Sequence, residues 1–151
     1  MTDLGRVFSE LVRLETELWN AADARLRADF NLPLSRYEPM RVIERRGSCR
    51  VNDIATELVI TIGGTSKLID RIEASGHCRR GPNPDDGRSS IIELTPSGRR
   101  LLAKASLALE DELNARLGVA LSPRMLQQFA ASLTKLRASG HDGGTTNRTA
   151  S

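Results

Sequence analysis

The fold is decided by residues 51–100, whose sequence is VNDIATELVITIGGTSKLIDRIEASGHCRRGPNPDDGRSSIIELTPSGRR. Apolar residues recur with helical spacing in two short segments, the first beginning at about Asn52 and the second at Thr61. Asparagine and threonine both accept hydrogen bonds from the free N–H groups of a first helical turn. Gly76 is expected to end the second segment, because glycine favours the conformation that follows a helix. The stretch therefore predicts two helices joined by a short turn.

A β-hairpin is predicted directly after these helices. Residues 77–80 and 90–94 have strand character, and residues 81–87 between them are rich in glycine, proline, asparagine and aspartate, as hairpin turns are. Residues 48–51 are expected to add a short strand that pairs with this hairpin. Two helices followed by a hairpin form a winged helix-turn-helix, which places its second helix in the major groove of DNA and its wing near the minor groove.

The order and spacing of several motifs resemble the MarR family of bacterial transcription regulators. The resemblance covers residues 4–136 and implies a mainly α-helical fold with a small β wing and six helices, in which the N- and C-terminal helices form the dimerisation region of an obligate homodimer. The motifs are LIDRIE at 68–73, then Gly76 and Arg80, DGR at 86–88 and LTPSG at 94–98.

Helices are also predicted on both sides of the central stretch. Hydrophobic periodicity predicts one over residues 3–28, a capping-box sequence from Ser35 to Glu38 opens another, with Pro39 at its fourth position, and leucine-rich helices follow Pro96 and Ser122. The first helix is apolar enough to need a partner subunit, although an ordinary core helix is the alternative. We predict one domain over 1–137, with dimerisation helices at 3–30 and 97–137, a reading head at 34–96 and a flexible tail at 138–151.

The residues outside the apolar stripe of the second helix are the candidate DNA contacts. Small residues at the front of this helix allow its backbone to approach DNA closely. Hydroxyl and ammonium groups can form hydrogen bonds with base edges or phosphates. The resemblance implies that Arg88 of the wing enters the minor groove and that Asp86 steadies an arginine of the reading head; the alternative is a solvated helix end and an exposed turn. Asp70 and Glu73 are expected to form intramolecular salt bridges. The predicted DNA-binding residues are Thr61, Gly63, Gly64, Thr65, Ser66, Lys67, Arg71, Asp86, Arg88 and Ser89.

Composition narrows the classes of function. The 151 residues carry a net charge of +3, and residues 61–100 hold seven basic against five acidic residues, so DNA affinity must depend on where the charges lie. Few aromatic residues argue against stacking on single strands. No apolar run approaches the roughly 20 residues that span a bilayer, and no signal peptide is apparent. We expect a cytoplasmic protein without a membrane partner.

No catalytic or metal-binding pattern is present in the sequence. His77 and His141 are far apart, and the glycines at 63 and 64 lack the lysine and hydroxyl residue that complete a phosphate-binding loop. Cys49 and Cys78 do not have zinc-site spacing. We predict that the protein is not an enzyme and needs no cofactor or metal.

The resemblance also implies a switch, because such regulators commonly release DNA when a small phenolic or lipophilic effector enters a crevice between dimer and reading head. Trp19, Tyr37 and Met40 are the candidate lining, with plain core packing as the alternative. Cys49 and Cys78 lie on candidate strands of one sheet, where nearby arginines would lower a thiol pKa; two buried small residues are the alternative.

The predicted function is a homodimeric, sequence-specific regulator of transcription, a repressor that binds pseudo-palindromic double-stranded DNA and is released by an effector. One alternative is a redox-sensing regulator that uses Cys49 and Cys78. Another is a winged-helix protein-interaction module without DNA binding, which would not need Arg88 or a helix front without bulky side chains.

Overall fold

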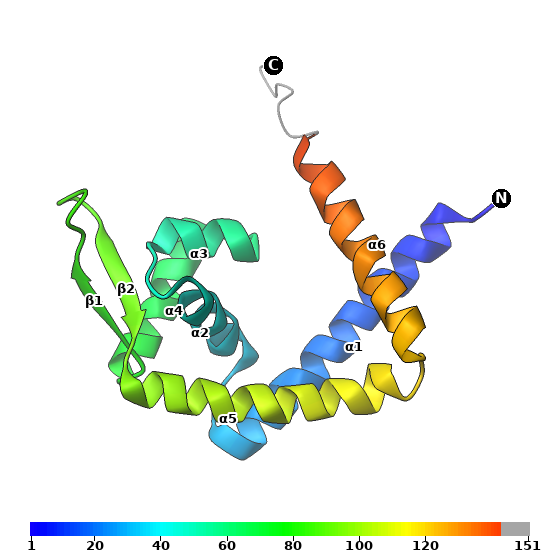
Figure 1. The fold of residues 1–151 in the computed structure, drawn as a ribbon, viewed down its shortest axis with the longest axis horizontal. Coiled ribbons are helices and arrows are strands. Elements are labelled where there is room, and N and C mark those ends of the chain that lie inside the picture. The colour runs from blue at the N-terminus through cyan, green and yellow to red at the C-terminus, as the bar shows by residue number, and fades with distance from the viewer. Residues whose placement is uncertain (143–151) are drawn as a thin grey trace. The chain divides into compact units, whose positions relative to one another are not determined.

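The computed structural model describes residues 1–142, and these form a mainly α-helical fold with one β-hairpin (Figure 1). The predicted winged helix-turn-helix with six α-helices is confirmed. The chain divides into two compact units, residues 1–112 and the residues from 113 onward. The elements are α1 (Leu4–Phe30), α2 (Leu34–Arg46), α3 (Val51–Leu58), α4 (Ile62–Ala74), β1 (Cys78–Pro82), β2 (Ser90–Leu94), α5 (Pro96–Leu113), the π-helix η1 (Asn114–Gly118) and α6 (Pro123–Asp142).

The core of the first unit lies where α2, α3 and α4 pack together and against the hairpin. Each of these helices presents one apolar stripe to the others, as amphipathic helices of a small domain do. No helix among residues 1–142 has the length and apolar character that crossing a membrane requires. In the core formed by α2, α3, α4 and the hairpin, the side chains with almost no exposed surface include Met40, Ile43, Ile54, Ile69, Ile72, Ile92 and Leu94.

The start of α4 follows the sequence prediction, whereas the start of α3 does not. The Thr61 hydroxyl accepts a hydrogen bond from the Gly64 N–H at 3.0 Å, as expected of the cap of α4. Asn52 is not the cap of α3, because the helix already begins at Val51. Instead, the Asp53 carboxylate in its first turn accepts the Arg50 N–H at 2.9 Å. The Arg50 N–H group at the start of the helix thus has its acceptor in the first turn of that helix.

The beginning of α2 also differs from the prediction. The helix begins at Leu34, and no capping hydrogen bond from Ser35 forms. The first N–H group donates instead to the Asp23 carboxylate of α1 at 2.9 Å. A side chain distant in sequence therefore caps α2, which no local motif could reveal. Pro39 consequently occupies the sixth helical position and not the fourth.

The hairpin is antiparallel, with Cys78 opposite Leu94 and Pro82 opposite Ser90. Its first strand is therefore shifted toward the turn relative to the predicted residues 77–80. The strand expected at 48–51 is reduced to one bridge, in which Cys49 and Ile92 exchange backbone hydrogen bonds of 3.1 and 2.7 Å. The strand ends there because Val51 already belongs to α3.

In the second unit, the π-helix η1 replaces the last turn of the long helix expected to reach residue 117. The Val119 N–H donates to the Asn114 carbonyl at 3.1 Å, five residues back. The side-chain oxygen of Asn114 occupies the space beside Gly118, 2.0 Å from where a Cβ would lie. A side chain at position 118 would therefore require the Asn114 side chain to rotate away.

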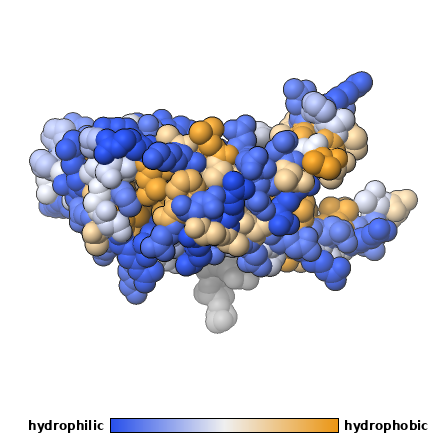
Figure 2. Space-filling model, turned by 90° about the horizontal axis from the view of Figure 1, so that it is seen from below, coloured by the Kyte–Doolittle hydropathy of each residue, from blue (hydrophilic) through white to orange (hydrophobic). Residues whose placement is uncertain are grey.

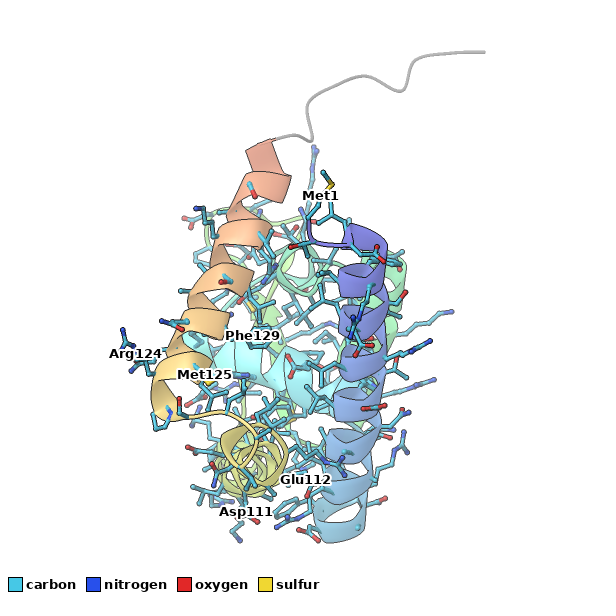
Figure 3. All side chains as sticks on the ribbon, turned by 90° about the vertical axis from the view of Figure 1, so that its right-hand side faces the viewer. Met1, Asp111, Glu112, Arg124, Met125 and Phe129 are labelled. Carbon is cyan, nitrogen blue, oxygen red and sulfur yellow. The ribbon has the colours of Figure 1, made fainter. Side chains whose placement is uncertain are left out.

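Helix α6 begins where the sequence predicts, because the Ser122 hydroxyl accepts the Met125 N–H at 3.3 Å. Met125 and Phe129 lie one turn apart on it, and Arg124 points away from their side (Figure 3). The tail predicted from residue 138 is wrong for residues 138–142, which continue α6. Extending an existing helix avoids the cost of nucleating a new one. The rest of the predicted tail, 143–151, lies outside the described residues.

The connection from the hairpin to α5 is closed by Thr95, which caps that helix as expected. Its hydroxyl donates to the Gly76 carbonyl at 2.6 Å and accepts the Gly98 N–H at 3.0 Å, while its own N–H donates to the His77 carbonyl at 3.0 Å. A Cβ at position 98 would lie 1.9 Å from the His77 oxygen. This contact with backbone cannot be relieved by a side-chain rotation, so only glycine fits.

We predict that Gly98→Ala lowers the free energy of unfolding by about 1–3 kcal/mol, because the added methyl group forces α5 away from the hairpin. Urea denaturation followed by circular dichroism measures this change. The matched control is Gly63→Ala, which adds the same methyl group where nothing lies within 4 Å. A Gly98→Ala protein as stable as the control would show that α5 does not approach the backbone this closely.

Candidate nucleic-acid interface

The front of α4 is exposed, and two of its first three residues are glycines. Its buried stripe consists of Thr65, Ile69 and Ile72, and the residues at 62–64 and 67 lie in the solvent-accessible part of the helix. Ser66 is half-buried. The positive end of the helix dipole and the free N–H groups lie at this front, where they favour an anion such as phosphate.

Thr65 is wrong as a predicted DNA contact. It is completely buried, and its hydroxyl donates to the Thr61 carbonyl at 2.7 Å. Residues four apart share one face of a helix, so Thr65 belongs to the same stripe as Ile69. The hydroxyl forms its hydrogen bond with the backbone of the chain instead of with water, and it has no access to a nucleic acid.

The two glycines of the helix front have different roles. A Cβ on Gly64 would lie 2.9 Å from the Thr61 hydroxyl oxygen, so this glycine preserves the cap. A Cβ on Gly63 would meet nothing within 4 Å, so folding does not require a glycine there. Its small size instead leaves room for a surface to approach the backbone.

Ion pairs divide the basic residues of this region into two groups. Arg80 contacts the Asp70 and Glu73 carboxylates at 2.7 and 3.2 Å, and Glu73 also accepts the Arg80 backbone N–H at 3.0 Å. The prediction that both acids form intramolecular salt bridges is thereby confirmed. Arg79 likewise pairs with Glu93 across the hairpin at 3.2 Å.

On α4 and the wing, three other cations remain exposed and make no ion pair within residues 1–142. These are Lys67 and Arg71 on α4 and Arg88 in the wing. Positive charge that no neighbouring acid neutralises is available for an external anion. Because the net charge is small, DNA affinity depends on where the exposed cations lie. These positions favour α4 and the wing as the DNA-binding surface.

The tip of the wing consists of turns. Asp86 does not pair with an arginine within residues 1–142; its carboxylate accepts the Arg88 backbone N–H at 3.0 Å. Ser89 is half-buried, and its hydroxyl accepts a hydrogen bond from the Asn83 side chain at 2.9 Å. Asp86 and Ser89 thus shape the turn, and Arg88 carries the charge at its tip.

Sequence reasoning missed an apolar patch beside the helix front. Val59, Ile60 and Ile62 are 75, 42 and 58% exposed and flank Thr61. Helical periodicity does not reveal it for Ile62, which shares the face of Ile69 but is exposed as the first residue of α4. We refer to Val59, Ile60 and Ile62 as the apolar patch.

Residues 32–90, which contain the helix pair and most of the wing, match the sequence profile of the MarR family. This segment of the chain is similar to the MarR family. A curated relative, the HTH-type transcriptional regulator TtmR of Methylorubrum extorquens, is 30% identical over 75% of this chain and 58% of its own length. The chain spans about half the length of the first curated relatives that it matches.

Solved structures of MarR-type proteins share the fold. Sco3205, a MarR family transcriptional regulator from Streptomyces coelicolor solved in complex with DNA, has a TM-score of 0.83 at 22% identity and covers 95% of this chain and 90% of its own. The transcriptional repressor CouR, bound to a 23-mer DNA duplex, has a TM-score of 0.79 at 22% identity and covers 91% of this chain and 99% of its own. At this identity the likeness establishes the fold alone.

The three predicted effector-pocket residues do not line one crevice. Tyr37 is buried, and its hydroxyl lies 3.0 Å from the Ser106 hydroxyl, while Met40 is completely buried. Both are core residues, which was the alternative interpretation. Trp19 is 42% exposed and lines a shallow depression confined to α1, together with Glu15, Thr16 and Asn20.

The cysteines are buried thiols on opposite sides of β2, since Cys49 bridges Ile92 and Cys78 pairs with Leu94. Burial raises the pKa of each thiol to about 11, and Asp53 beside Cys49 and Glu73 beside Cys78 act in the same direction. An arginine does lower each thiol pKa, Arg46 for Cys49 and Arg80 for Cys78, but burial outweighs this effect. No group of three or more metal-binding side chains occurs within residues 1–142.

We predict that neither thiol reacts readily in the folded protein at neutral pH. A pKa of about 11 in place of 9.0 reduces the thiolate fraction about 100-fold. Labelling with a chromogenic disulfide should thus be at least about 100-fold slower in buffer than in urea. A cysteine that reacts equally fast in both would contradict the burial.

The same shift predicts a pH dependence of stability. A folded-state pKa above the unfolded value stabilises the protein fully below about pH 9, and this contribution is lost as the pH rises from about 9 to 11. Thermal unfolding of the wild type and of a Cys49→Ala, Cys78→Ala variant across this range measures the effect. The variant should lose less stability than the wild type; equal losses would contradict the assignment.

Proposed function

We propose that the protein is a sequence-specific, double-stranded DNA-binding regulator of transcription. The observation that carries the proposal is the division of charge: Arg79 and Arg80 are paired with acids, whereas Lys67, Arg71 and Arg88 are exposed without ion pairs within residues 1–142. A helix front without bulk and a cation at the wing tip suit a major groove and its neighbouring minor groove. DNA-bound structures among its MarR-type neighbours support the same function.

In this proposal the contacts differ in kind. Thr61, Gly63 and Gly64 bring the backbone of α4 close to the DNA, and Ser66 and Lys67 contact base edges or phosphates. Arg71, one turn further along, contacts phosphate. Asp86 and Ser89 position the tip of the wing from which the guanidinium of residue 88 reaches the minor groove.

We further propose that the functional form is a homodimer that binds a pseudo-palindromic site. Only Ala22 and Leu26 of α1 are buried, both in its second half. Its first half exposes Leu4 by 77% and Phe8 by 68%, and exposed hydrophobic residues are visible toward the right-hand end of Figure 2. An apolar helix face of this length is expected to be covered by a second copy of the chain.

The finer part of the proposal is repression relieved by a small phenolic or lipophilic effector. The MarR family and the repressor among the similar structures support it. Of the three residues predicted for the effector, Trp19 alone has an exposed apolar side chain, so the effector would contact α1 there.

Two alternatives remain distinguishable from this proposal. The redox-sensing regulator is disfavoured because burial raises the pKa of Cys49 and Cys78 and the two thiols lie on opposite sides of β2. A winged-helix module that binds only proteins is disfavoured by the exposed cations, but the apolar patch beside them gives it a specific observation in its support.

We predict that Arg88→Ala weakens binding to every duplex and reduces the dependence of log K on log salt by about one unit, because one phosphate-region contact is lost. Ser66→Ala and Lys67→Ala should instead change which sequence is preferred. Gel-shift titrations at several salt concentrations measure both effects.

The matched control is Arg79→Ala, which removes an arginine of the same hairpin that already pairs with Glu93. Its salt dependence should equal that of the wild type. If Arg88→Ala binds like the wild type, the wing does not contact DNA.

We predict that Phe8→Glu converts the dimer into monomers without unfolding the chain, because this side chain is 68% exposed and is dispensable for the core. Size-exclusion chromatography with light scattering gives the mass. Ser9→Glu introduces the same charge on another face of α1 and should remain dimeric. A Phe8→Glu protein with the mass of two chains would place the interface elsewhere.

A further inference from the structure

The apolar patch has no role in the core. Val59, Ile60 and Ile62 stand at the turn between α3 and α4, and each exposes at least 42% of its surface. Three β-branched residues at one turn are unusual, since glycine, asparagine, aspartate and serine favour such positions. Their presence therefore needs an explanation outside the folding of the chain.

Val59 makes this point most directly. It ends α3 with φ 57° and ψ 45°, a left-handed conformation that is unfavourable for a β-branched residue. Its backbone N–H is satisfied by carbonyl groups of α3, but its side chain is 75% exposed. The turn would be less strained with asparagine or glycine, and the valine side chain contributes little burial in return.

The surroundings of the patch indicate what covers it. Ile62 is the first residue of α4, next to Gly63, where the backbone is open to close approach, and one turn before Ser66 on the same helical face. Lys67 and Arg71 lie further around the helix, about 140° and 180° from Ile62. The patch thus adjoins the glycine and the hydroxyl that are proposed to approach the major groove.

We propose that Ile62, flanked by Val59, recognises the C5-methyl group of a thymine in the major groove; this rests on the proposed function. The first residues of a recognition helix meet base edges. Thymine alone among the four bases presents a methyl group there, and a branched aliphatic side chain offers only an apolar contact. Ile62 therefore specifies a thymine in each half-site of a pseudo-palindrome, in addition to any hydrogen bonds from Ser66 and Lys67.

The test begins with a duplex selected by the wild-type protein from a random DNA library. Each thymine is then replaced by uracil, which removes the C5-methyl group and leaves the base-pairing edge unchanged. Affinities of the wild type, Ile62→Ala and Ile62→Val are measured for all duplexes by fluorescence anisotropy. Thermal unfolding of the three proteins verifies that the exposed substitutions leave the fold intact.

The proposal predicts one thymine per half-site at which uracil weakens wild-type binding about four-fold, and more than about ten-fold when both half-sites are changed, as expected for burial of one methyl group each. Ile62→Val, which keeps the branched side chain, should retain this sensitivity. Ile62→Ala should bind thymine and uracil duplexes equally, so that the two changes are not additive.

Two results would overturn the proposal, and they differ in what else they contradict. Specific binding by the wild type with no uracil effect, or with the same effect in Ile62→Ala, removes the methyl contact but leaves the proposed function intact. Failure of the library to yield a preferred duplex removes the proposed function as well. In that second case the apolar patch would support the alternative function, a winged-helix module that binds only proteins.

Discussion

The contacts of Arg80 with Asp70 and Glu73 connect α4 to β1 and so fix the wing relative to the recognition helix. Ion pairs this close to the surface contribute only about 0–1 kcal/mol each. Most of the stability must instead come from the buried residues beneath them, such as Ile69 and Ile92. The ion pairs therefore matter chiefly for orientation, because they hold the two elements that we propose to face DNA in one geometry.

The same contacts decide where positive charge is available. The two acids of α4 lie among the cations proposed to bind DNA and would repel phosphate if they were unpaired. Because Arg80 offsets part of their charge, these acids oppose less strongly the cations of α4 and the wing, which are Lys67, Arg71 and Arg88. The apolar patch beside them adds a contact of different chemistry, suited to a base edge and not to the backbone.

Local patterns predicted the elements of the fold well, because caps such as Thr61 and Ser122 act within a few residues. They failed where a partner came from elsewhere in the chain, as with Asp23 capping α2. For the candidate site, the cations were predictable from the order of motifs. The burial of Thr65 and the exposure of Ile62 depend on the phase of α4 against its neighbours, which only the packed structure defines.

The most direct test is a titration of the wild-type protein with the duplex immediately upstream of its own gene, at two salt concentrations and with the dimer verified by light scattering. If the unpaired cations of α4 and the wing bind DNA, binding is tight at low salt and weakens steeply as salt rises, because phosphate counterions are released. Absence of binding at low salt by an intact dimer would contradict the proposed interface.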